Sequence, residues 1–394
     1  MVASLQASAA GDMHLPDVPQ EVYERKHVPA LDGVRGVAIA MVVLTHLGAI
    51  LRDFGFVRYF EFGWMGVDLF FVLSGFLITR ILLDTRNDER YFRRFYIRRG
   101  LRIWPLYYVY LGLTLLFLSV MGHLAQKGSA AGGGHFDFAM TSPVWLYLLF
   151  VQNLNPASLF SLRDAMLAIT WSLCIEEHFY LAWPVCVRNF SRRALRWILI
   201  AILAASPFLR LAAAHVGRNK PYNFWYQMVN RCTPFHLDSI TAGCLLCLVW
   251  LSIGRHRGSI YFFASLFAAG LCGTVFCLMG GRNASVFSFC YTALAAMFSG
   301  LVGLTLLGRF TAIFTQPFLR YLGKISFGLY LIHPSLFVIF QSHRVFDRLG
   351  MARHILVAEC VAALLACALS LSLAHLSWKF FESRVLSLKA RLAP

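Results

Sequence analysis

The stretch RGVAIAMVVLTH, residues 35–46, places two ionisable side chains, Arg35 and His46, at the ends of a largely apolar run. Eleven residues make about three helical turns, so both side chains fall on one helix face, roughly 16 Å apart along its axis. The apolar residues between them suit a lipid bilayer, in which ionisable groups are costly and face a cavity or a partner. The pair is therefore our first candidate for a functional site.

The rest of the chain has the composition of a membrane protein. Of its 394 residues, 58% are apolar and only 14% are charged, too few for the surface of a soluble protein of this size. The apolar residues form blocks about twenty residues long, the length that crosses a hydrocarbon core. We predict an all-α, polytopic transmembrane helical bundle without a soluble catalytic domain, and ten spans at about residues 35–52, 62–83, 102–122, 166–187, 197–215, 234–252, 260–279, 286–307, 324–341 and 354–376.

Residues 28–386 form the predicted transmembrane domain, between cytoplasmic tails at 1–27 and 387–394. An additional apolar stretch, residues 142–154, is too short to cross alone, and we interpret it as interfacial or re-entrant. If it does cross, the orientation of every later span reverses.

The distribution of positive charge predicts the orientation of the bundle. The net charge is +17, and with the N-terminus in the cytoplasm most of the 36 lysine and arginine residues fall in cytoplasmic segments. This bias follows the positive-inside rule, indicates N-in and C-in termini, and explains the charge without a nucleic-acid partner. The ten cysteines lie mostly within spans and lack metal-ligand spacing, so we predict apolar packing and no metal site.

Several further ionisable residues fall inside the predicted spans. His46, Glu176, Glu177 and His333 lie near the middle of the bilayer on this topology, whereas Asp68 and Asp238 lie about one turn from its outer face. His333, Asp68 and Asp238 are as consistent with structural hydrogen bonds between helices as with function. The adjacent carboxylates of Glu176 and Glu177 must be paired or protonated at that depth, and with His46 they are our candidate catalytic residues.

Arginines dominate the cytoplasmic level, with seven of them in residues 84–102, more than orientation requires. Arginine binds phosphate bidentately, and a neutral imidazole such as His46 is a suitable general base that a nearby carboxylate could orient. This layout fits a phosphate-bearing donor that enters from the cytoplasm and reaches a base within the membrane. An acyl-CoA has that shape, as a donor substrate rather than a bound cofactor.

Seven stretches also follow one another in an order and at a spacing that resemble one known family: LDGVRG (31–36) leading to His46, GVDLFFVLSGFLI (66–78), FYIRRGLRIWPLYY (95–108), TWSLCIEEHFYLAWP (170–184), FHLDSITAGCLL (235–246), LGKISFGLYLIHP (322–334) and KFFESRV (379–385). Through them, residues 28–386 resemble the acyltransferase family 3 integral membrane proteins. This group includes bacterial O-acetyltransferases of lipopolysaccharide and exopolysaccharide, and some macrolide acyltransferases.

The resemblance implies transfer of an acyl group, most often acetyl, from cytoplasmic acyl-CoA to a hydroxyl, usually on a carbohydrate or lipid-linked glycan. It implies a multi-pass protein of the bacterial inner membrane, with His46 as the base and Arg35 near the donor. The basic segment Arg98, Arg99 and Arg102 would meet the CoA phosphates. The motif residues expected along the central path or at the acceptor are Asp68, Phe70, Phe71, Ser74, Gly75, Trp171, Tyr180, Asp238 and His333.

The chain departs from the family pattern in two respects. Longer members carry a C-terminal hydrolase-like domain, which we do not expect in this protein, and His236 stands where members often carry arginine. The nature of the acceptor and the oligomeric state stay open. Acylation of a secondary metabolite such as a macrolide is an alternative function. A proton-coupled transporter would also contain buried acids and histidines, although we find no inverted repeat. A structural or sensor membrane protein would leave the arginine cluster unexplained.

Overall fold

The computed structural model describes residues 28–129, 142–155, 165–217, 219, 222–254, 256–280, 283–341 and 355–393, and these contain helices and no strand. The long helices are α2 (Pro29–Gly48), α3 (Gly66–Asp84), α4 (Tyr91–Ser129), α8 (Trp171–Asn189), α9 (Arg192–Val216), α11 (Asp238–Ile253), α12 (Arg257–Met279), α14 (Cys290–Leu306), α16 (Pro317–Phe340) and α18 (Ile355–Ser377). Each predicted span coincides with one of them. The prediction of an all-α polytopic bundle is therefore confirmed.

Eight helical stretches of the described chain are long and apolar enough to cross a membrane by length and composition alone. The two predicted spans outside this set are α8, whose apolar run is interrupted by Glu176 and Glu177, and α11, which has only 16 residues. Most residues of α11 and many of α8 are buried against neighbouring helices. This burial explains how α8 can carry two glutamates and how α11 can be short within the bundle. N-in and C-in orientation stays a prediction.

The boundaries of the first span differ from those predicted. Helix α2 begins at Pro29 rather than Arg35 and ends at Gly48, so His46 lies in its last turn and not in the middle of a span. The chain then forms η1 (Gly55–Met65), which packs back along the end of α2. There the Thr45 hydroxyl donates to the Phe60 carbonyl at 3.0 Å. Element η1 therefore packs against the end of α2 that carries His46.

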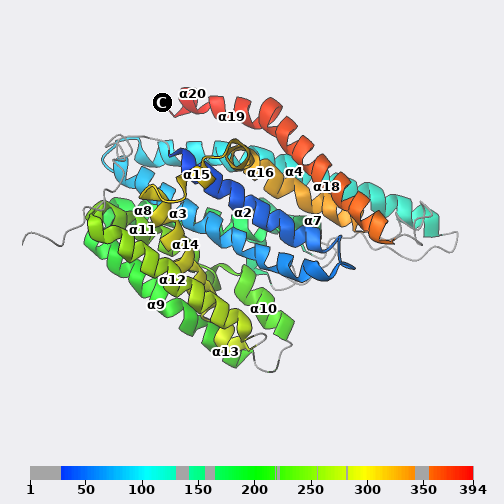
Figure 1. Cartoon of the computed structure of the whole chain (residues 1–394). Coiled ribbons are helices and arrows are strands. Elements are labelled where there is room, and N and C mark those ends of the chain that lie inside the picture. The colour runs from blue at the N-terminus through cyan, green and yellow to red at the C-terminus, as the bar shows by residue number, and fades with distance from the viewer. Residues whose placement is uncertain are drawn as a thin grey trace, which may run out of the picture.

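Helix α3 lies between two groups of helices (Figure 1). It packs against α2 on one side and against α11 and α14 on the other. Helices α9, α11, α12 and α14, green to yellow in the figure, form one group. Helices α2, α16 and α18 form the second, and α4 runs alongside. Residues from both groups therefore meet around α3.

Helix α2 and helix α16 approach so closely that their backbones touch at glycines. A Cβ atom added to Gly36 would lie 2.0 Å from the Leu319 carbonyl oxygen, and one added to Gly323 would lie 1.9 Å from that of Asp32. Small residues drive helix association in membranes, where the hydrophobic effect between helices is absent. The LDGVRG motif therefore fixes α2 against α16, which brings their histidines to one level.

The stretch 142–154 forms only α5 (Val144–Leu148) and η2 (Gln152–Leu154), and neither can cross a bilayer. Its end is held by side chains: Gln152 Nε2 donates to Thr170 Oγ1 at 2.9 Å, and Asn153 Nδ2 donates to the Arg231 carbonyl at 3.0 Å. The prediction that this stretch does not cross alone is confirmed. The predicted tail 1–27 lies outside the described residues.

The remaining short elements connect or cap these helices: α7 (Ala165–Ala168), α10 (Tyr222–Arg231), η3 (Thr233–Phe235), α13 (Ala284–Phe287), α15 (Thr311–Phe314), η5 (Trp378–Glu382), α19 (Ser383–Ser387) and α20 (Lys389–Leu392). The last two, red in Figure 1, fold back over the start of α4. There Arg98 donates from Nη2 to the Ala393 carbonyl at 2.9 Å.

Candidate functional site

Two cavities inside the bundle contain most of the predicted site residues. The donor-side cavity, of about 920 Å³, lies among α2, α3, α4, α8 and α16. The histidine cavity, of about 160 Å³, contains His46. Val67 of α3 and Tyr330 of α16 line both cavities, so the two spaces meet at these residues.

More arginines than carboxylates line the donor-side cavity. The five arginines are Arg35, Arg80, Arg98, Arg99 and Arg102, and the three carboxylates are Asp32, Asp84 and Glu176. Arg35 forms a hydrogen bond from Nη1 to Asp32 Oδ1 at 3.4 Å. The Arg99 guanidinium carbon lies 5.9 Å from the ring centroids of both Phe95 and Tyr180. The structure thus brings all four predicted donor-binding arginines to one cavity, and the excess of positive charge suits an anionic ligand.

The inner part of the donor-side cavity is aromatic, with Phe70, Phe71 and Tyr330 in its wall. Ser74 also faces this space, and its hydroxyl lies 2.9 Å from the Tyr180 hydroxyl. The Glu176 carboxyl group forms side-chain hydrogen bonds with both Ser74 and Tyr180. Ser74, Tyr180 and Glu176 therefore form one polar cluster in the wall of the donor-side cavity.

In the histidine cavity, His46 lies beside His333 of α16, which is fully buried. The ring centroids are 5.0 Å apart, and His333 Nε2 lies 3.3 Å from His46 Nδ1. Each Nδ1 also faces a carbonyl one turn earlier in its own helix, Val42 at 2.9 Å for His46 and Leu329 at 2.7 Å for His333.

These contacts assign the protons of both rings. A carbonyl oxygen only accepts, so each ring carries its hydrogen on Nδ1. The Nδ1–H group of His46 then points toward both the Val42 carbonyl and the Nε2 lone pair of His333. His46 Nε2 keeps its own lone pair and can accept a proton, which is the state that a general base needs.

The predicted orienting carboxylate is not the group that contacts His46. Glu176 lines the donor-side cavity, and Glu177 accepts a hydrogen bond on Oε2 from Trp104 Nε1 at 3.2 Å. Depth along the helix placed these acids at the level of His46, but adjacent residues point about 100° apart around a helix axis. His333 takes the expected place of the carboxylate.

A second polar pair closes the histidine cavity on the α11 side. Asp68 Oδ1 accepts from the Ser239 hydroxyl at 2.6 Å and lies 3.0 Å from His236 Nε2. His236 Nδ1 faces the Asn230 carbonyl, so this nitrogen carries a hydrogen. Trp171 packs on His236 with ring centroids 5.3 Å apart.

Asp238 and Gly75 are among the predicted site residues that line neither cavity. Asp238 is fully buried and accepts hydrogen bonds from Arg210 on both oxygens, Nη1 to Oδ2 at 2.6 Å and Nη2 to Oδ1 at 3.1 Å. Gly75 faces α11, and a Cβ atom there would lie 2.1 Å from the Ile240 carbonyl oxygen. Asp238 thus joins α9 to α11, and Gly75 permits the contact of α3 with α11, so their expected place in the central path stays a prediction.

Several residues of the histidine cavity were missed in the sequence. Asn230 and Arg231 lie at the end of α10, in an aromatic segment that reads as an interfacial loop. Thr45 and Trp64 also line the cavity. The charge bias does not single out Arg231, because other arginines such as Arg52 and Arg58 also fall on the predicted outer side.

Comparison of the sequence with known proteins identifies the family to which this chain belongs. The family model for an acyltransferase domain matches residues 28–376. Peptidoglycan O-acetyltransferase OatA of Listeria monocytogenes is 27% identical over 384 residues, which are 92% of this chain and 56% of that protein. O-acetyltransferase OatA of Staphylococcus aureus is 25% identical over 385 residues, 93% of this chain and 58% of that protein.

The chain therefore spans less than two thirds of the length of either relative. No solved structure matches it. The match over residues 28–376 includes the first six of the seven motifs, and it confirms the resemblance to acyltransferase family 3. The protein belongs to the family of integral membrane proteins defined by this acyltransferase domain, acyltransferase family 3.

Proposed function

We propose that this protein is a membrane O-acyltransferase that moves an acetyl group from cytoplasmic acetyl-CoA to a hydroxyl of a cell-envelope glycan. The observation that carries the proposal is the meeting of two cavities at Val67 and Tyr330. The donor-side cavity is lined by arginines, and the histidine cavity contains the imidazole of His46, which has an available lone pair. A donor and an acceptor that enter from opposite ends would meet at this junction.

The donor-side cavity suits the phosphates of CoA. Guanidinium groups bind phosphate oxygens in a fork, and Arg35, Arg98, Arg99 and Arg102 surround one mouth. The aromatic inner part suits the narrow, uncharged arm that carries the thioester. The acetyl carbonyl would then lie near Val67, close to the space that His46 faces.

The transfer step follows from the protonation of His46. His46 Nε2 removes the proton of the acceptor hydroxyl as the hydroxyl oxygen attacks the thioester carbonyl carbon. The new C–O bond forms, the C–S bond breaks, and the CoA thiolate leaves and takes the proton back from the imidazolium. His333 Nε2 accepts the hydrogen bond from His46 Nδ1–H, and this bond strengthens when His46 becomes positive.

The acceptor is assigned to a glycan on two grounds. The relatives from Listeria and Staphylococcus are named as O-acetyltransferases, the first of peptidoglycan. The histidine cavity combines Asn230 and Arg231 with the indole rings of Trp64 and Trp171. Amide and guanidinium groups can bind sugar hydroxyls, and aromatic faces pack against the apolar faces of a sugar ring. The protein would then act in the bacterial inner membrane.

The test uses the full chain, purified in lipid nanodiscs, with radiolabelled acetyl-CoA and three acceptors: peptidoglycan fragments, a lipid-linked sugar and a macrolide. We expect label to appear on a glycan, and His46→Ala to abolish transfer while CoA binding persists. Wild-type turnover by His46→Ala would overturn the role of the base. Transfer only from a donor other than acetyl-CoA would overturn the donor assignment, and labelling of the macrolide alone would overturn the acceptor.

A further inference from the structure

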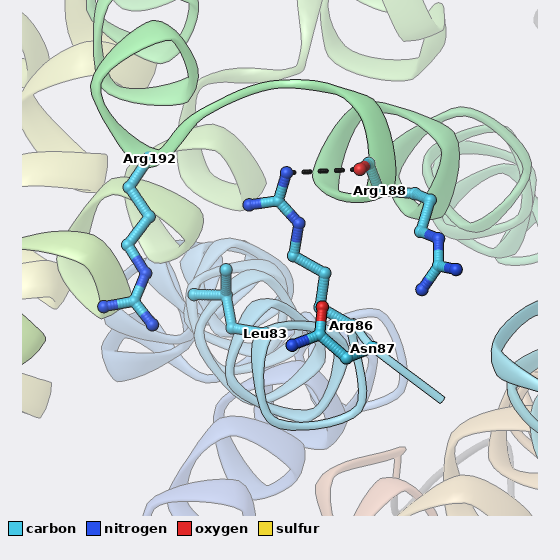
Figure 2. A pocket seen from close by; sticks show the side chains of 5 residues that line it. All are labelled: Leu83, Arg86, Asn87, Arg188 and Arg192. Atoms are coloured by element: carbon cyan, nitrogen blue, oxygen red, sulfur yellow. Dashed lines mark hydrogen bonds between the residues drawn. The ribbon is translucent and has the colours of Figure 1, made fainter. Parts of the chain in front are cut away.

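A second basic pocket lies at the end of α3, outside the donor-side cavity. It has a volume of about 460 Å³ and lies between the end of α3, the loop after it and the turn from α8 to α9 (Figure 2), and it is lined by Leu83, Arg86, Asn87, Arg188 and Arg192. We call it the α3–α8 arginine pocket. None of its residues lines the donor-side cavity. Arg80 and Asp84 of the same helix face that cavity, whereas Leu83 faces the pocket.

The contacts of the pocket arginines leave their charges uncompensated. Arg86 Nη2 donates to the Arg188 carbonyl at 3.2 Å, as Figure 2 shows, and the Arg188 guanidinium lies 5.5 Å from the Tyr91 ring centroid. Neither contact supplies a negative charge. Among the residues that the structure describes, no carboxylate forms an ion pair with Arg86, Arg188 or Arg192.

Asp88, in the loop after α3, is already engaged. Asp88 accepts from the Arg90 backbone N–H at 2.8 Å and pairs with Arg94. The hydrogen bond from Arg90, together with the charge of Arg94, lowers the pKa of Asp88. Asp88 is therefore ionised but directed at Arg94, and three cations share one concave site.

Apolar side chains continue from the pocket along the surface of α8. Leu181 and Val185 precede Arg188 by seven and three residues, which places all three on one helix face. Leu181 is 62% exposed and Val185 is 47% exposed. In a membrane-spanning helix, such exposed apolar side chains face lipid chains. The arginines belong to the end of the bundle that the positive-inside rule assigns to the cytoplasm.

We propose that the α3–α8 arginine pocket binds the phosphate headgroup of an anionic phospholipid, with one acyl chain along Leu181 and Val185. Basic pockets between transmembrane helices at the cytoplasmic face bind such headgroups, because the anionic lipids of that leaflet supply the charge. A soluble phosphate has the same charge without a chain, so the apolar face of α8 favours the lipid. The proposal does not depend on acyl transfer.

The test measures lipid binding to the full chain in detergent by native mass spectrometry, with dioleoyl phosphatidylglycerol and dioleoyl phosphatidylcholine as probes. We expect the wild-type protein to retain phosphatidylglycerol preferentially. Arg192→Gln should weaken its binding about fivefold, the effect of one arginine near a membrane surface. Arg193→Gln is the matched control, because Arg193 is also exposed and does not line the pocket.

Arg86 supports the end of α8 through the Arg188 carbonyl, so Arg86→Gln could unfold this region. Arg192→Gln avoids this problem, since Arg192 is exposed and makes no hydrogen bond to another residue that the structure describes. Equal retention of both lipids, or an equal loss in Arg193→Gln, would overturn the proposal. Displacement of phosphatidylglycerol by equimolar glycerol 3-phosphate would show a site for soluble phosphate and would overturn the lipid assignment.

Discussion

His333 Nε2 lies 3.3 Å from His46 Nδ1, although the two histidines belong to helices at opposite ends of the chain. The close contact of α2 with α16, made possible by Gly36 and Gly323, brings the rings together. The Nδ1–H of His46 lies near both the Val42 carbonyl and His333 Nε2, and His46 lines the histidine cavity. The first two predictions distinguish the role of His46 as a general base from the role of His333 as the residue that positions it.

Replacement of His46 by alanine removes the proposed base. We expect the rate of acetyl transfer to fall about 10²–10⁴-fold, the usual contribution of a general base. CoA binding should stay within about twofold, because the arginines lie in the other cavity. His178→Ala is the control, since His178 bonds Thr233 at 2.8 Å and lines neither cavity. An equal loss in both variants would contradict a specific role for His46.

His333 is predicted to be a positioning residue. His333→Leu leaves the His46 Nδ1–H without this acceptor, and the loss of one hydrogen bond, about 1 kcal/mol, should lower kcat about fivefold. The KM for acetyl-CoA should not change. His333→Gln keeps a side-chain acceptor and should restore part of the rate. Failure of glutamine to do better than leucine, with both proteins folded, would indicate a purely steric role.

The sequence predicts the helices well, because a bilayer requires apolar runs of one length and allows no other regular structure but a closed barrel. It also predicts the depth of each buried charge approximately. It does not predict rotation about the helix axis. Asp68 and Asp238 lie at one predicted level, yet Asp68 lines the histidine cavity and Asp238 faces Arg210. Arg231 was missed for another reason: it ends the short helix α10, whose aromatic sequence reads as an interfacial loop.

Neutralisation of an arginine in the donor-side cavity should weaken CoA binding. A charge-assisted hydrogen bond contributes about 1.5–3 kcal/mol, so Arg102→Gln should raise the dissociation constant of CoA at least about tenfold. The dependence of binding on salt should also decrease, which titration at two ionic strengths would measure. Arg93→Gln serves as the control, because Arg93 is exposed on the same helix and does not line the cavity. An unchanged affinity would argue against a phosphate site at this mouth.

The junction between the two cavities can be tested with a larger side chain. Val67→Phe should block the contact of donor and acceptor and abolish transfer, while CoA still binds at the arginines. Val67→Ala widens the junction and should retain activity. The added volume costs about 1–3 kcal/mol of stability, so the thermal midpoint of each variant must be measured. Wild-type transfer by a folded Val67→Phe protein would show that the substrates meet elsewhere.

The buried pair of Arg210 and Asp238 predicts a loss of stability rather than of chemistry. Arg210→Met leaves the Asp238 carboxylate buried without its partner, and breaking such a pair costs about 3–5 kcal/mol. The double variant Arg210→Met with Asp238→Leu removes both charges and should recover most of that loss, because an apolar pair of similar volume replaces the ions. Thermal unfolding in detergent measures both effects. A residue that only joins α9 to α11 affects the reaction only through stability. An Asp238→Leu protein that kept its thermal midpoint but lost transfer would therefore indicate that Asp238 contacts the acceptor.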